Sequence, residues 1–184
     1  MELEAGKTIE IDFDLEPETM SLDEVVVTGT KTFQRKTQAP VIVNVLGKGT
    51  LQAVEANNIA EGLNFQPGLR VETDCQTCNY TQLRMNGLGG SYSQILMNSR
   101  PIFSPLIGLY GLEQIPASMV ERIEVVRGGG SALYGSSAIG GTVNVITQIP
   151  TKNSYDLSYA YHNINGRAND NVLNGNVSIV NKKR

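Results

Sequence analysis

The stretch VERIEVVRGGGSALYGSSAIGGTVNVIT, from Val120 to Thr147, decides the fold of this chain. Apolar and polar residues alternate at both of its ends, which predicts strands over Ile123–Arg127 and Thr142–Thr147. The apolar positions are Ile123 and Val125 in the first strand and Val143 and Val145 in the second. Between the strands, the triple glycine Gly128-Gly129-Gly130 is followed by a helical turn that we expect over Ser131–Tyr134 and that should end at Gly135. So many glycines in one connection predict backbone that turns tightly or approaches another segment closely.

Length and composition limit the class of protein. The chain has 184 residues, a net charge of -3 and only one histidine. The acidic balance argues against a nucleic-acid binder, because no basic stripe appears before Lys182-Lys183-Arg184. No apolar run is long enough for a transmembrane helix. The start, MELEAGKTIEIDF, does not resemble a signal peptide, so we expect either a cytoplasmic protein or a chain that begins after its signal.

The segments ERIEVVRG, SALYG and AIGGTVNVIT resemble, in this order, the end of the plug domain of TonB-dependent outer-membrane receptors. The segment RMNGLGG and the later YSQILMNSRP are similar to the siderophore, haem and cobalamin receptor class. The resemblance implies an α+β fold: a small plug with a mixed, mostly four-stranded sheet and short helices. In the family this plug is enclosed by a transmembrane β-barrel in the bacterial outer membrane.

The resemblance also divides the chain. Residues 1–20 contain the alternating stretch Thr8–Leu15 and resemble the remnant of a preceding β-sandwich extension, as in Bacteroidetes-type receptors. Residues 21–30 match the TonB box, 31–149 the plug, and 150–184 the first β-hairpin of a truncated barrel.

In residues 21–30, two acidic residues are followed by a run of three valines. The alternative to a TonB box is a short strand without a special role. An extended segment with free backbone groups can be captured at the edge of another protein's sheet. The resemblance implies that the C-terminal domain of TonB binds this segment through Asp23, Glu24, Val25, Val26 and Val27.

Within the plug, the pattern predicts a polar linker over residues 32–39, then a series of short elements. Strands are expected over Val41–Leu46, Leu69–Thr73, Gln82–Asn86 and Tyr92–Met97. A helix over Leu51–Asn64 would take Thr50 as its N-cap. A second helix over Pro116–Met119 would use a capping box of Ser118 and Glu121. Asn98-Ser99 stands where the family usually has Asp-Gly, which leaves the turn type open.

The last segment alternates over residues 155–161 and 173–179, with a polar turn between. One face is aromatic or aliphatic and the other is small and polar, which suits a membrane hairpin with lipid outside and lumen inside. A water-soluble sheet edge gives the same pattern. The position just after the plug-like stretch favours the barrel hairpin.

No catalytic constellation emerges, so we do not expect an enzyme or a cofactor. The triple glycine lacks the Lys of a phosphate loop, and His162 alone cannot supply a triad or a metal site. Cys75 and Cys78 are too few for a structural zinc site. They form either a local disulfide or two free thiols, and an oxidising periplasm favours the disulfide.

Two segments match by position the plug loops that help form the substrate site in the family. The residues implied are Asp74, Gln76, Thr77, Asn79, Tyr80, Ser104, Leu106, Ile107 and Tyr110. Four charged residues match positions that hold the plug against the barrel wall: Arg84, Glu121, Arg122 and Arg127. The plainer interpretations are surface loops without a ligand and a solvated strand face.

The sequence therefore predicts the plug of an outer-membrane active transporter, energised through TonB. Its partners would be TonB, its own β-barrel in the outer membrane, and a small-molecule substrate such as an iron–siderophore complex, haem or a cobalamin. The alternative is a soluble periplasmic binding or signalling module without a barrel. Several hundred further residues of alternating strands in the natural gene would favour the transporter.

Overall fold

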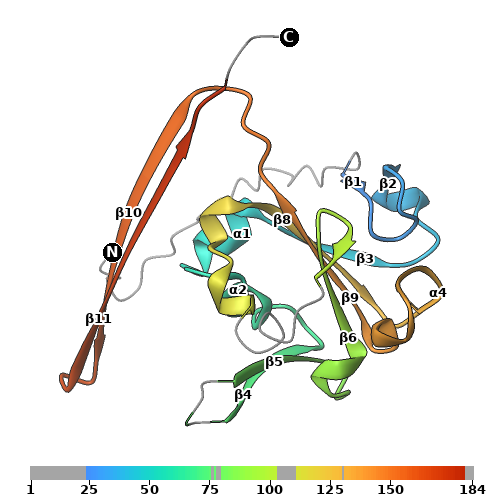
Figure 1. Ribbon diagram of the computed structural model, residues 1–184, viewed down its shortest axis with the longest axis horizontal. Coiled ribbons are helices and arrows are strands. Elements are labelled where there is room, and N and C mark those ends of the chain that lie inside the picture. The colour runs from blue at the N-terminus through green and yellow to red at the C-terminus, as the bar shows by residue number, and fades with distance from the viewer. Residues whose placement is uncertain (1–23, 76, 78–79, 103–110, 130, 181–184) are drawn as a thin grey trace, which may run out of the picture.

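A computed structural model describes residues 24–75, 77, 80–102, 111–129 and 131–180 (Figure 1). Its main sheet has five strands in the order β3-β8-β9-β6-β7. Their bounds are Val43–Gly47 for β3, Val120–Arg127 for β8, Gly141–Thr147 for β9, Ser93–Met97 for β6 and Arg100–Pro101 for β7. Only β6 and β9 run parallel, so the sheet is mixed. The predicted α+β fold is confirmed, with the two-residue β7 added to four longer strands.

The larger core lies on one face of this sheet. Ile123, Val125, Val143 and Val145 are fully buried there, as their alternation predicted. Helices α1 (Lys48–Ala53) and α2 (Ile59–Leu63) pack onto this core, as does the antiparallel pair of β4 (Leu69–Cys75) and β5 (Tyr80–Met85). In β5 the predicted inward residues Leu83 and Met85 are buried.

The helix predicted over residues 51–64 is wrong, because two shorter helices replace it. Thr50 lies inside α1, whose N-cap is Gly47. The chain breaks at Glu55, which takes a positive φ of 52°. Asn58 then caps α2, since its side chain accepts a hydrogen bond from the Glu61 N–H (3.1 Å). Two short helices, each with its own N-cap, therefore take the place of the single predicted helix.

The capping box predicted at Ser118 and Glu121 is also wrong. The helix there is a single 3₁₀ turn, η3 (Ala117–Met119), preceded by Pro116 and without a side-chain cap. Glu121 already belongs to β8. A turn this short needs no cap because the strand hydrogen bonds begin at once.

The stretch from β8 to β9 folds as its sequence predicts. Helix α4 (Ser131–Tyr134) ends at Gly135, which has a φ of 90°. The 3₁₀ turn η4 (Ser136–Ala138) then leads into β9. At Gly141 a Cβ atom would lie 2.5 Å from the carbonyl oxygen of Val126, so only glycine lets the strands approach this closely.

The turn at Asn98-Ser99 joins β6 to β7 with positive φ at both residues, 49° and 67°. Two positive φ values define a type I′ hairpin turn. The turn is tied to β9, because Asn98 Oδ1 accepts from the Thr147 N–H (3.0 Å) and the Ser99 N–H donates to Asn144 Oδ1 (2.9 Å). These bonds hold serine in a conformation that it rarely adopts.

The opposite face of the sheet is covered by the first described residues. Strands β1 (Val25–Val26) and β2 (Gln34–Arg35) form an antiparallel pair beside β3, and η1 (Lys36–Gln38) follows (Figure 1). Val26, Val43 and Val126 form a second small core beneath them. The polar linker predicted over residues 32–39 is therefore wrong in part, since it contains a strand and a 3₁₀ turn.

The C-terminal hairpin of β10 (Ser154–Ile164) and β11 (Ala168–Ser178) forms a sheet of its own that extends away from the rest (Figure 1). Both strands were predicted. The remaining helical pieces are η2 (Gly90–Tyr92) and residues 111–114. No helix in the described part of the chain has the length and apolarity needed to cross a membrane.

Candidate functional site

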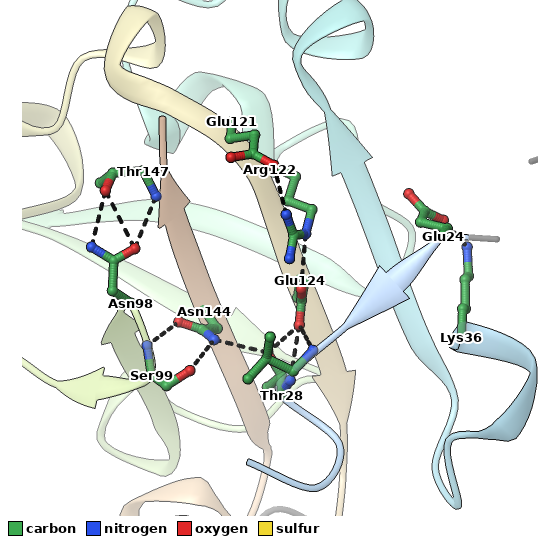
Figure 2. A network of polar contacts seen from close by, with 11 residues as sticks. Glu24, Thr28, Lys36, Asn98, Ser99, Glu121, Arg122, Glu124, Asn144 and Thr147 are labelled. Atoms are coloured by element: carbon green, nitrogen blue, oxygen red, sulfur yellow. Dashed lines mark hydrogen bonds and ion pairs between the residues drawn. The ribbon is translucent and has the colours of Figure 1, made fainter. Parts of the chain in front are cut away.

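A buried carboxylate holds the N-terminal strand against the sheet. Glu124 lies in the centre of β8 with a side chain that is 0% exposed. Its Oε2 accepts three hydrogen bonds: from the Val27 N–H (2.8 Å), the Thr28 N–H (2.9 Å) and the Thr28 hydroxyl (2.7 Å) (Figure 2). A carboxylate with this many donors is well satisfied without water, and such charge-assisted bonds are stronger than neutral ones.

Arg122 supplies the balancing positive charge at the second oxygen of the carboxylate. Arg122 Nε donates to Glu124 Oε1 (2.9 Å), and Arg122 Nη1 reaches the more exposed Glu121 (2.8 Å). The Arg122 side chain is only 16% exposed, so its charge also depends on these partners. Arg122 and Glu124 are two residues apart in β8. Because side chains alternate along a strand, both lie on the same face and can pair.

Thr28 connects this pair to the next strand. Its hydroxyl donates to Glu124 and accepts from Asn144 Nδ2 (3.0 Å) on β9. Asn144 in turn contacts the Ser99 hydroxyl (3.2 Å) at the β6–β7 turn (Figure 2). A single network therefore joins residue 28 to three parts of the main sheet.

Tyr134 adds a fourth attachment from helix α4. Its hydroxyl donates to the Thr28 carbonyl (3.0 Å), and Lys31 Nζ lies 5.0 Å from the centre of its ring. Burial raises the pKa of the Tyr134 hydroxyl above its usual 10.0, and the negative charge of Glu124 raises it further. The hydroxyl therefore stays protonated as a donor at neutral pH.

The predicted TonB-binding segment lies in the docked strand, except for Asp23, which falls outside the described residues. Val26 and Val27 are buried, whereas Val25 is 41% exposed. The Lys36 N–H donates to the Glu24 carbonyl (2.8 Å), and Lys36 Nζ pairs with the Glu24 carboxylate (3.0 Å). The segment is thus bound on one side to Lys36 and packed on the other against the main sheet. Its binding of TonB stays a prediction.

The predicted substrate loops are described only in part. Asp74 belongs to β4, Thr77 is exposed in a turn, and the half-buried Tyr80 begins β5. The other predicted loop residues lie outside the described residues: Gln76, Asn79, Ser104, Leu106, Ile107 and Tyr110. Cys78 does too, so the disulfide with Cys75 and the substrate-binding roles stay predictions.

The four residues predicted to contact a barrel all have partners within the plug. Arg84 forms an ion pair with Glu72. Arg127 Nη1 donates to the Pro67 carbonyl (3.0 Å), and Arg122 pairs with Glu121 and Glu124 as described above. Contact with a barrel wall stays a prediction for all four. Among the residues that the structure describes, no three His, Cys, Asp or Glu side chains gather as metal ligands.

Sequence reasoning missed most of the network. No role was expected for Thr28, Glu124, Tyr134 or Asn144. One signal was available. Glu124 and Asn144 are polar residues in the middle of the two strands predicted within Val120–Thr147, and they are direct cross-strand partners in the observed register. Buried polar side chains at the centre of a sheet must find hydrogen-bond partners.

The domain matches a family model over more than half of the chain. Residues 35–142 fit the family model described as the TonB-dependent receptor plug domain. The chain is 35% identical over 127 residues to the vitamin B12 transporter BtuB of Photobacterium profundum, which covers 69% of this chain. It is 32% identical over 145 residues to the ferric enterobactin receptor PirA of Pseudomonas aeruginosa, which covers 72% of this chain.

Solved structures of receptors share the fold of this chain. The siderophore receptor PirA of Acinetobacter baumannii superposes with a TM-score of 0.61 and 27% identity, over 73% of this chain and 22% of that one. The chain belongs to the TonB-dependent receptor plug domain family. It spans only about a fifth of its curated relatives, 21% of the B12 transporter and 19% of the enterobactin receptor.

Removal of the Glu124 carboxylate should destabilise the plug strongly. In Glu124→Ala, Arg122 keeps a largely buried charge without its main partner, and the Val27 and Thr28 donors lose their acceptor. Loss of one partner of a buried ion pair costs about 3–5 kcal/mol. Urea unfolding of the chain in a mild detergent measures this loss.

The matched control is Glu121→Ala, which removes the other carboxylate that contacts Arg122. Glu121 is 49% exposed, so the change should cost less than about 1 kcal/mol. Equal losses in the two variants would contradict a special role for Glu124.

The Tyr134 attachment should fail at alkaline pH. Because the folded-state pKa is raised, its contribution to the free energy of unfolding is complete below pH 10 and is lost as the pH rises through the folded-state pKa. Tyr134→Phe should therefore destabilise the chain at pH 8, and the difference from the wild type should shrink above pH 10. Tyr155→Phe, on the exposed hairpin, is the control and should match the wild type at each pH. A difference for Tyr134→Phe that stays constant with pH would contradict this assignment.

Proposed function

We propose that this chain is the plug of a TonB-dependent active transporter in the bacterial outer membrane. The observation that carries the proposal is the docked strand that follows residue 23. Glu24 and Val27 are held by hydrogen bonds to Lys36 and Glu124, and Val26 packs in a small core that is separate from the larger one. Family membership and the names of the relatives, a B12 transporter and a ferric enterobactin receptor, support the same conclusion.

Residues 23–27 are proposed as the TonB-binding segment, within a box at residues 21–30. An extended strand binds a partner by adding to the edge of the partner's sheet. This needs backbone N–H and C=O groups that are free of internal bonds. Release of the strand from Glu124 and from β2 would therefore come before capture by TonB.

Residues 150–184 are proposed as the first hairpin of the surrounding barrel, and residues 31–149 as the plug itself. The burial of the hairpin supports this. On its polar face His162, Asn174 and Asn176 are half-buried beside the plug, although Asp156 and Ser158 are exposed. On its apolar face Tyr155, Leu157 and Leu173 are 89%, 75% and 70% exposed. A hairpin that exposes its apolar face suits a lipid environment. Residues 1–20, proposed as the remnant of an extension, lie outside the described part.

The proposed substrate is an iron complex, such as a ferric siderophore or haem, or a cobalamin. The relatives named for vitamin B12 and ferric enterobactin support these classes equally. The segments 74–80 and 104–110 are proposed to contact the substrate at the outer end of the plug.

Coupling would arise from two states of the plug, with the N-terminal strand docked or released. A substrate can shift this equilibrium only if it binds the two states with different affinity. The network from Ser99 through Asn144 to Thr28 and Glu124 offers a physical connection, because it joins the strand to the β6–β7 turn just before residues 103–110.

Calorimetry with a purified TonB C-terminal domain tests the proposal. A synthetic Ser21–Thr30 peptide should bind saturably. The same peptide with Val26→Pro should not, because proline removes a backbone donor from the added strand. Val26→Ile keeps that donor and is the matched control.

The same pair of variants should be compared in the full-length receptor. Val26→Pro should abolish substrate uptake at normal surface expression, whereas Val26→Ile should not. Normal uptake by the proline variant would show that the box is elsewhere.

A further inference from the structure

The docked strand β1 has a partner strand that the chain itself supplies. β1 and β2 pair antiparallel, with Val25 opposite Arg35 and Val26 opposite Gln34. The Lys36 N–H donates to the Glu24 carbonyl (2.8 Å), which extends the ladder by one residue. The pairing therefore covers the centre of the proposed TonB-binding segment.

The ladder shows which edge of β1 is occupied. Hydrogen-bonded and non-hydrogen-bonded pairs alternate along antiparallel strands. Since Glu24 and Lys36 form a hydrogen-bonded pair, Val26 and Gln34 form the next one. The backbone groups of residues 24 and 26 therefore face β2, and those of Val25 face the opposite edge.

The opposite edge is restricted by the sheet. The Val27 N–H points to that side and donates to Glu124 Oε2 (2.8 Å). Val27 and Thr28 are buried against β8, which leaves little access for a foreign strand. The β2 side, in contrast, lies at the surface, because Arg35 and Lys36 are exposed.

We propose that β2 occupies the docking edge of the TonB-binding segment, so that TonB binds by strand exchange. The incoming strand takes the backbone groups of Glu24 and Val26 that β2 now holds. Residues 34–36 thus act as an internal competitor that keeps the segment closed until β2 detaches. This inference rests on the proposed function and adds to it the edge that is used and the segment that must leave.

A reversible covalent lock tests the exchange. Cα atoms of a non-hydrogen-bonded antiparallel pair lie about 4.5 Å apart, within the range that a disulfide spans. The double variant Val25→Cys, Arg35→Cys is made in a Cys75→Ser, Cys78→Ser background to prevent mispairing. Calorimetry then measures binding of the TonB C-terminal domain to the oxidised and the reduced chain.

Strand exchange predicts that the oxidised chain does not bind and that reduction restores binding. Equal binding by both forms would overturn the inference, because TonB would then use the other edge. The free Ser21–Thr30 peptide separates this failure from a failure of the proposed function. If the peptide does not bind, the proposed segment itself is wrong, and the inference falls with it.

A second pair of variants tests the same point without a crosslink. Gln34→Pro removes the backbone donor to Val26 and leaves residues 21–30 unchanged. Loss of one net hydrogen bond from the competitor should tighten TonB binding about threefold to tenfold. Gln34→Ala keeps the donor and should bind like the wild type. Unchanged or weaker binding by a folded Gln34→Pro chain, checked by circular dichroism, would overturn the inference.

Discussion

The structure depends on one buried carboxylate. Glu124 Oε2 gathers three donors from Val27 and Thr28, while Arg122 neutralises its other oxygen. A buried charge without partners would be costly, so the acid at the centre of β8 requires the N-terminal strand to dock. In return, the strand shields the second face of the sheet. The same hydrogen bonds make the strand part of the fold and would have to break before the strand could leave.

Release of the strand has a definite energetic meaning. Each hydrogen bond to a charged group contributes about 1.5–3 kcal/mol, and the small core under Val26 adds its own burial. The proposed partner would have to offset these terms for residues 24–27, either through new backbone pairing or by supplying work. The large core around Ile123 and Val143 is a separate cluster, so release of the strand would leave the contacts within that core in place.

The sequence predicts the fold well where local pattern and packing agree. Alternation in β8 and β9 placed Ile123 and Val145 correctly, because one face of each strand is apolar and a shift by one residue would turn that face away from the core. The helix caps predicted at Thr50 and Ser118 were wrong, because the position of a cap depends on the residue at which the helix begins. It also missed Glu124, since a strand pattern cannot show that residues almost a hundred positions earlier will cover the polar face. Long-range contacts of this kind need the assembled sheet.

Amide hydrogen exchange at Val27 and Thr28 tests the central claim most directly. The account predicts that both amides are strongly protected in the wild-type chain and exchange rapidly in Glu124→Ala, while those of Val143 and Val145 stay protected in both. Rapid exchange at Val27 and Thr28 in the wild-type chain would contradict docking through Glu124. So would protection of these two amides that survives the loss of the carboxylate.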